Sequence, residues 1–157
     1  CHRSTQVTCV EWHELTRINT KKQVKNRYLQ KLPMTDLIYK DEAYELTGIC
    51  MEVHNELGPG LLEIIYKEAI EWELDDRMIQ YEREKGYPVY YKKHLLRKKF
   101  NADSVVYDKI ILEVKSKETI SNEDIAQTIN YLKLSGCRLG LNVNFGRSKL
   151  ETKRLAN

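Results

Sequence analysis

The sequence predicts a domain of the α/β class, with a mixed central β-sheet flanked by α-helices. Apolar residues recur at helical spacing in three segments, residues 36–57, 61–76 and 121–135. Runs rich in β-branched and aromatic residues occupy three others, residues 78–100, 103–115 and 138–145, and residues 148–155 add a short terminal helix or strand. Helical and strand segments are thus mixed within a chain of the size of one domain, which indicates the α/β class.

Composition places the chain among ordinary globular proteins. Its 157 residues are 41% hydrophobic and 31% charged, and no apolar run approaches the ~20 residues that a membrane span needs. The four cysteines form no C-x-x-C pair and no zinc-binding spacing, so we expect reduced thiols in a cytoplasmic protein.

The positive charge is concentrated at the start of the chain. Residues 1–33 hold 7 Lys and Arg against 2 Asp and Glu, whereas residues 34–157 hold 19 against 21. We expect Met34 to be the natural start, residues 1–33 to be a leader that is not native, and residues 34–157 to form one domain. The alternative is a basic extension that contacts nucleic acid. Because the excess of basic residues lies in residues 1–33, the alkaline pI of the whole sequence does not indicate that residues 34–157 bind nucleic acid.

The first two helices are separated by Gly58-Pro59-Gly60, because Gly serves as a left-handed C-cap and Pro cannot continue a helix. Periodicity predicts that the second helix buries Leu62, Ile65 and Ala69. The third helix should begin at Ser121, whose capping box would use Asp124, and should end at Gly136. Its predicted buried stripe consists of Ile125, Ile129 and Leu132.

Residues 103–115 predict a hairpin that turns at residues 107–109. Folding the segment there pairs residue 106 with 110 and 104 with 112, which places Asp103 opposite Glu113 and puts Lys115 on the same face. Two facing carboxylates repel each other unless a cation lies between them, and a hard divalent ion would fulfil that requirement. The alternative is the solvated face of an amphipathic hairpin.

The motif Gly60-Leu61-Leu62-Glu63-Ile64-Ile65-Tyr66 follows Val53-His54-Asn55-Glu56-Leu57-Gly58-Pro59, and residues 139–146 read Leu-Gly-Leu-Asn-Val-Asn-Phe-Gly. With these motifs the chain resembles the GxxExxY proteins, a bacterial family of the PD-(D/E)XK nuclease superfamily. The resemblance covers residues 37–157 and implies that residues 34–157 form a PD-(D/E)XK nuclease-like domain. It implies a restriction-endonuclease-like mixed central β-sheet flanked by α-helices.

The resemblance also implies an active site. Asp103, Glu113 and the Val114 carbonyl would bind Mg²⁺, with Mn²⁺ as a substitute, and Lys115 would assist the attacking water. Glu63 would hold a metal-bound water or a second ion, although an acid in the first turn also suits the helix dipole.

Three further residues would position the substrate. Gln127 and Tyr131 are four apart on the third helix and match the Gln-x-x-x-Tyr motif of RecB-type nucleases, although periodicity alone predicts that they face solvent. Tyr66 belongs to the GxxExxY motif itself.

The function that we predict is a metal-dependent nuclease that hydrolyses phosphodiester bonds, in DNA in preference to RNA. The alternative is a binding module for nucleic acid or a protein partner, which keeps the fold without turnover. We expect no membrane association. The sequence leaves open whether the protein forms a homodimer. A cluster of basic residues in 92–99 fits two interpretations equally, a phosphate-binding surface and a solvated hairpin tip.

Overall fold

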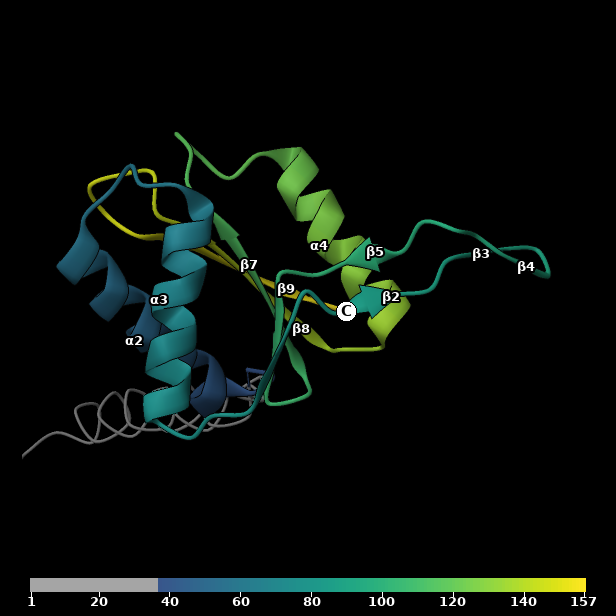
Figure 1. The fold of residues 1–157 in the computed structure, drawn as a ribbon, viewed down its shortest axis with the longest axis horizontal. Helices are drawn as coiled ribbons and strands as arrows, with labels where there is room; N and C mark the ends of the chain where they lie inside the picture. The colour runs from purple at the N-terminus through teal and green to yellow at the C-terminus, as the bar shows by residue number, and fades with distance from the viewer. Residues whose placement is uncertain (1–36) are drawn as a thin grey trace, which may run out of the picture. The chain divides into compact units, whose positions relative to one another are not determined.

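The computed structural model describes residues 37–157, which form three helices around a central five-stranded sheet (Figure 1). The helices are α2 (Lys40–Leu57), α3 (Glu63–Asp76) and α4 (Asn122–Ser135). The sheet contains β1 (Tyr81–Arg83), β6 (Ser104–Val106), β7 (Ile110–Lys115), β8 (Leu139–Asn144) and β9 (Glu151–Ala156). Predictions for the leader 1–33 and for Met34 lie outside the described residues.

The strand order in the sheet is β1-β6-β7-β8-β9. Strands β7 and β8 are parallel, because α4 connects them, and the other neighbours pair antiparallel. The α/β class with a mixed central sheet is therefore confirmed. The terminal segment, left open between helix and strand, is the edge strand β9. Within residues 37–157, no helix has both the length and the apolar character that crossing a bilayer requires.

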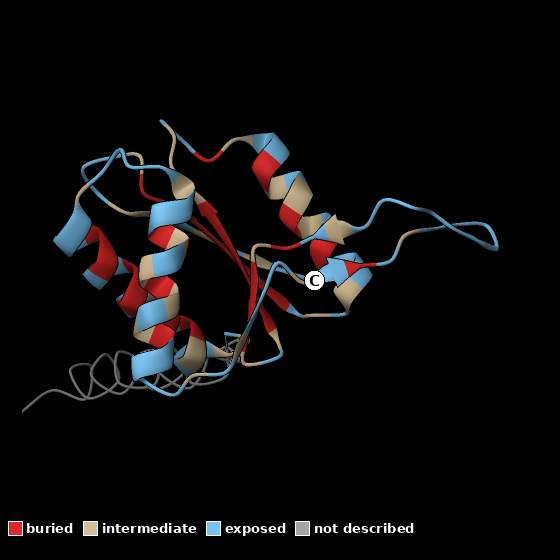
Figure 2. Cartoon of the chain, viewed as in Figure 1, coloured by how far each residue is buried: buried red, intermediate tan, exposed pale blue. Residues whose placement is uncertain are grey.

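Helices cover both faces of the sheet. Alternate residues of β7 (Ile110, Leu112 and Val114) pack against α2 and α3, whereas Ile111 packs with Tyr131 and Leu132 of α4. Figure 2 shows the resulting buried band running through the central strands, between the helical layers. Because β7 is covered on both faces, any polar side chain along it is held in a largely apolar environment.

The predicted hairpin register is confirmed. Ser104 pairs with Leu112, Val105 with Ile111 and Val106 with Ile110. The turn contains two residues of positive φ, Tyr107 and Asp108, and is closed by a 3.2 Å hydrogen bond from Lys109 N to Val106 O. Two consecutive residues of this conformation match the twist of a tight hairpin.

The ends of α4 are also as predicted, but the buried faces of α3 and α4 differ from the prediction, except at Leu132. Ser121 and Asp124 form the capping box of α4, and Gly136 is its left-handed C-cap. In α3 the buried residues are Tyr66, Ile70 and Leu74, while the predicted stripe is largely exposed. In α4 the buried residues are Asp124, Thr128, Tyr131 and Leu132. Polar groups on α4 are tolerated there because they bond to the sheet, as the 2.6 Å bond from Thr128 Oγ1 to Asn142 Oδ1 illustrates.

Two short ribbons extend from the sheet. Strand β2 (Gly86–Tyr87) pairs with β5 (Phe100–Asn101), and beyond them β3 (Tyr90–Tyr91) pairs with β4 (His94–Leu95). The strand predicted around Pro88 is thus divided at that residue, which has no backbone N–H to continue a ladder.

Candidate active site

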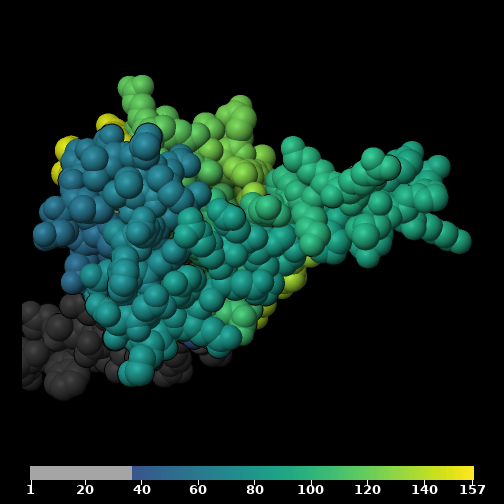
Figure 3. All heavy atoms as spheres, viewed as in Figure 1, coloured from purple at the N-terminus to yellow at the C-terminus, as the bar shows by residue number. Residues whose placement is uncertain are grey.

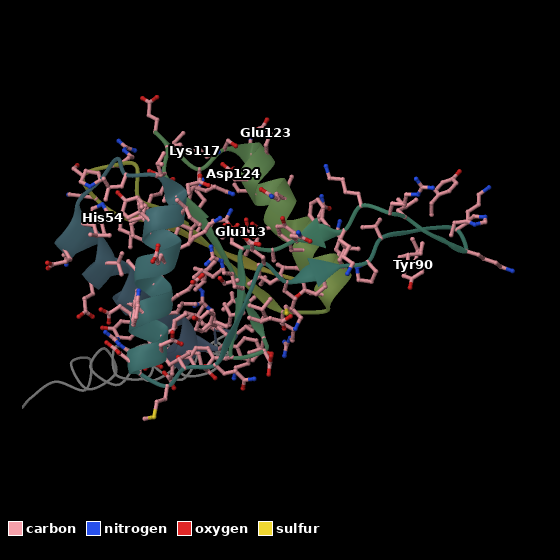
Figure 4. The ribbon with its side chains drawn as sticks, viewed as in Figure 1. His54, Tyr90, Glu113, Lys117, Glu123 and Asp124 are labelled. Carbon is pink, nitrogen blue, oxygen red and sulfur yellow. The ribbon has the colours of Figure 1, made fainter. Side chains whose placement is uncertain are left out.

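Two carboxylates meet where β6 begins and β7 ends. Asp103 precedes β6, and its backbone N–H donates to Glu113 Oε1 at 3.1 Å. In return, Val114 N donates to Asp103 Oδ2 at 3.0 Å. The hairpin register therefore brings the two side chains together, as the sequence predicted. Figure 4 shows Glu113 in the interior, in the region between α3 and α4.

Burial makes this pair electrostatically costly. Glu113 is 1% exposed, and burial, followed by the negative charge of Asp103, raises its pKa from 4.5 to about 7. Lys115 Nζ lies 3.4 Å from Glu113 Oε2. Burial by itself would lower the pKa of Lys115, but the charges of Glu113, Asp103 and Glu63 outweigh that effect and raise it. Lys115 is therefore a fixed cation beside the carboxylates.

A second lysine, which the sequence analysis did not identify, belongs to the same cluster. Lys67 of α3 places Nζ 2.6 Å from Asp103 Oδ1, and both side chains are about one-fifth exposed. Lys67 lies four residues after Glu63, on the same face of the helix, and this i, i+4 spacing was the available signal. The structure thus balances two carboxylates with two lysines.

Glu63, the first residue of α3, approaches the site from its edge. Its Oε1 accepts a 3.2 Å hydrogen bond from Ser116 N, directly after β7. It lines an open pocket together with Ser116, Lys117 and Arg147. Within residues 37–157, no three His, Cys, Asp or Glu side chains converge as a metal-binding group, so Glu63 does not complete a three-carboxylate cluster.

Tyr66 is fully buried and does not face a substrate surface. Its hydroxyl donates to Gly58 O at 2.7 Å and accepts from Leu61 N at 3.0 Å. Its ring stacks on Phe145, with 4.3 Å between centroids. These contacts fix the loop that leads into α3, so Tyr66 acts on the site indirectly, by setting the start of the helix that carries Glu63 and Lys67.

Gln127 and Tyr131 point inward, contrary to what helical periodicity predicted. Gln127 Nε2 donates to Tyr131 Oη at 3.0 Å, and the Tyr131 hydroxyl donates to the carbonyl of Asn101. Burial and then the charge of Glu113 raise the pKa of Tyr131, which is 3% exposed. The resemblance to RecB-type nucleases was the signal that indicated this face, and the contact holds the backbone two residues before Asp103.

The loop after β7 is fixed by a buried amide. Asn144 Oδ1 accepts from Lys117 N at 3.0 Å and its Nδ2 donates to Lys117 O at 2.9 Å. Gly146 lies against the same segment, where a Cβ would be 2.0 Å from Lys117 O. Only glycine allows this approach, so Gly146 helps to fix the path of the chain after Lys115.

The donor set suits a small, hard cation. Asp103 and Glu113 offer carboxylate oxygens at the same place, and ionised carboxylates are the ligands that Mg²⁺ prefers. Mg²⁺ usually takes only one or two protein carboxylates and completes its coordination with water and substrate oxygens. Two carboxylates without a third are therefore sufficient. A bound cation would also lower the raised pKa of Glu113, because positive charge favours the ionised carboxylate.

Comparisons with known proteins agree with this fold. The crystal structure of SSO0001 matches with a TM-score of 0.50 and 19% identity, over 76% of this chain and 60% of that one. The chain thus spans about 60% of that protein's length, and the likeness concerns the fold alone. A search of curated proteins gives no significant match.

The match that identifies the family is to a sequence-family model. The model of the PD-(D/E)XK nuclease superfamily matches residues 40–155, from the first residue of α2 into β9. The restriction-endonuclease-like fold is therefore confirmed, and the matched range contains the hairpin with both carboxylates and Lys115. The chain belongs to the PD-(D/E)XK nuclease superfamily.

Proposed function

We propose that this protein is a Mg²⁺-dependent nuclease that hydrolyses phosphodiester bonds in DNA, acts in the cytoplasm and belongs to the GxxExxY branch of its superfamily. The single observation that carries the proposal is the cluster of Asp103, Glu113 and Lys115. A buried carboxylate with its pKa raised to about 7 costs stability, and a purely structural hairpin has no use for it.

In this proposal Asp103, Glu113 and the Val114 carbonyl hold Mg²⁺, with Mn²⁺ as a substitute. The ion would supply Lewis-acid polarisation of the scissile phosphate. Support comes from the mutual bonds of the Asp103 and Glu113 segments, which fix both carboxylates before any ligand arrives. Such preorganisation reduces the reorganisation that catalysis requires.

Lys115 is proposed to act on the substrate. Its ammonium lies at the edge of the carboxylate pair and is held charged by it, so it orients the attacking water and stabilises the negative charge that develops on the phosphate. A lysine with a raised pKa is a poor proton acceptor near neutral pH. Positioning and charge stabilisation are therefore its main contributions.

The remaining residues support this centre. Glu63 would orient a water or a second ion at the open pocket beside Ser116. Tyr131, fixed by Gln127, positions the segment before Asp103 and, through it, the substrate strand. Tyr66 positions the start of α3 through the Gly58 loop.

The test is a cleavage assay on single- and double-stranded DNA and RNA with Mg²⁺, comparing wild type with Lys115→Ala. We expect cleavage of DNA by the wild type and a loss of about 10²–10³-fold in the variant, as for the removal of one preorganised electrostatic group. Lys133→Ala, an exposed lysine on α4, is the control and should cleave normally. A Lys115→Ala protein that cleaves at the wild-type rate contradicts the assignment.

The second candidate function is a binding module without turnover. One observation favours it: residues 34–157 carry 19 basic against 21 acidic residues, whereas surfaces that bind phosphate are usually basic. Binding of nucleic acid without metal-dependent cleavage of any substrate would make this the better description.

A further inference from the structure

A β-hairpin projects from the domain on the side away from α2 and α3. This basic hairpin, residues 88–99, contains β3 and β4 and continues the β2–β5 ribbon outward (Figure 1). In Figure 3 it forms a narrow projection that stands clear of the other described residues. Residues 90–99 are all exposed, and Val89 is half-buried. Tyr90, labelled in Figure 4, lies about midway along the projection.

The charge of the described chain is divided sharply between this hairpin and the rest. Residues 37–157 contain 19 Lys and Arg and 20 Asp and Glu. Five of the 19 basic residues and none of the 20 acidic residues lie in the hairpin, which leaves 14 against 20 elsewhere. The five basic residues are Lys92, Lys93, Arg97, Lys98 and Lys99. A near-neutral total therefore hides a hairpin of net charge +5 on a domain of net charge −6.

These cations have no acidic partners within residues 37–157. None of the five takes part in a salt bridge there, and each is exposed. Lys92 lies over the ring of Tyr91, with 5.5 Å from Nζ to the centroid. Tyr90 and Tyr91 are more than 60% exposed beside them. Such a surface complements a polyanion.

The root of the hairpin is built into the candidate active site. Strand β5 ends at Asn101, whose carbonyl accepts from Tyr131, and Ala102 and Asp103 follow directly. Phe100 packs on Tyr131, with 4.4 Å between ring centroids. A polyanion on the hairpin would therefore be held at a defined position relative to Asp103.

The reach of the hairpin indicates how much substrate it would cover. His94 and Asn101 are seven positions apart, which at ~3.3 Å per residue gives at most about 23 Å. This length equals at most about seven base pairs, at the 3.4 Å rise of duplex DNA. A two-stranded β-ribbon fits the major groove of B-form DNA, whereas the major groove of A-form RNA is too narrow.

We propose that the basic hairpin binds the phosphate backbone of duplex DNA along the major groove, over up to about seven base pairs to one side of the scissile bond. This inference rests on the proposed function, because it names the substrate of the same site as duplex DNA that extends past the cleavage position. The backbone contacts carry no base readout, so the hairpin supplies affinity and register without sequence preference.

The test measures binding separately from cleavage. Fluorescence anisotropy with a labelled 24-base-pair DNA duplex is recorded in EDTA over a range of salt concentrations, using the full chain. The variant is Lys92→Gln/Lys93→Gln/Lys98→Gln. The matched control, Lys40→Gln/Lys133→Gln/Lys149→Gln, removes the same charge from exposed lysines outside the hairpin, none of them in a salt bridge within residues 37–157. Melting temperatures verify that both variants fold.

We expect the hairpin variant to bind at least tenfold more weakly in low salt, with a log–log salt slope smaller by about 2.7, since each phosphate contact contributes ~0.9. The control should change the slope by less than one. Equal effects of the two variants, or wild-type protein without affinity for the duplex, overturn the inference. Tighter binding to single-stranded DNA or to duplex RNA overturns the duplex assignment. A hairpin-dependent affinity without cleavage in Mg²⁺ supports the inference and refutes the proposed turnover.

Discussion

Replacing the buried carboxylate of Glu113 by its amide should stabilise the metal-free protein at alkaline pH. The folded state holds the pKa of Glu113 at about 7, against an ordinary value of 4.5. The folded protein therefore binds a proton more tightly than the unfolded chain does. Between these two pH values its free energy of unfolding falls as pH rises, and above pH 7 the loss is complete. Glutamine has no such titration and keeps an oxygen that can accept from Asp103 N.

The magnitude follows from the shift. A difference of about 2.5 pH units at ~1.36 kcal/mol per unit corresponds to about 3 kcal/mol. Part of the gain is offset, because Lys115 loses one of the three carboxylates whose charges raise its pKa. We therefore expect Glu113→Gln to gain about 1–3 kcal/mol at pH 8, equivalent to several degrees in melting temperature at about 4 °C per kcal/mol.

Thermal unfolding from pH 4 to pH 8.5 in EDTA provides the measurement. Wild type and Glu113→Gln should coincide near pH 4 and diverge as pH rises. Glu56→Gln, an exposed residue of α2, is the control and should follow the wild type within about 0.5 kcal/mol. With Mg²⁺ at 100 times its dissociation constant the wild type should gain about 2.7 kcal/mol, and the variant should not. A metal-free variant that melts below the wild type at pH 8 refutes the reasoning.

Three further predictions follow from the cluster and its supports. Lys67→Met removes the cation paired with Asp103, so Mg²⁺ should bind several-fold more tightly by calorimetry; weaker binding contradicts competition between Lys67 and the metal. Glu63→Gln should cost no more than about 1 kcal/mol of stability yet reduce DNA cleavage at least tenfold. Unchanged cleavage would mean that Glu63 only interacts favourably with the dipole of α3. Gly146→Ala should lose about 3 kcal/mol in urea unfolding, because its Cβ would collide with the backbone of Lys117, whereas Gly48→Ala in α2 meets no neighbour and should gain up to about 1 kcal/mol.

The hairpin that carries the site could be predicted from local sequence. The register of a tight hairpin is fixed by its turn, and a slip of one residue would move Ile110, Leu112 and Val114 out of the core. The same alternation places Glu113 and Lys115 on the opposite face. Helix ends were predictable for a similar reason, since Ser121 and Gly136 determine them through local hydrogen bonds and backbone conformation.

The buried faces of α3 and α4 could not be predicted from periodicity alone, because tertiary partners decide them. Tyr131 lies opposite the predicted apolar stripe of α4, and it is buried because Phe100 and the Asn101 carbonyl, 30 positions away, receive its ring and hydroxyl. Lys67 was missed for the same reason: its partner Asp103 is 36 positions distant. The exposure of Leu62 at 73% likewise depends on where α3 meets the sheet, which no local pattern encodes.

The segment before β6 connects two helices that never share a core cluster. Asp103 is held by Lys67 of α3, and two residues earlier Asn101 is held by Tyr131 of α4. Opening of either helix would thus release the same few residues and dismantle the carboxylate pair. A ligand that binds only the assembled pair should therefore slow amide hydrogen exchange in both helices together. The two layers would then open as one cooperative unit, although the sheet lies between them.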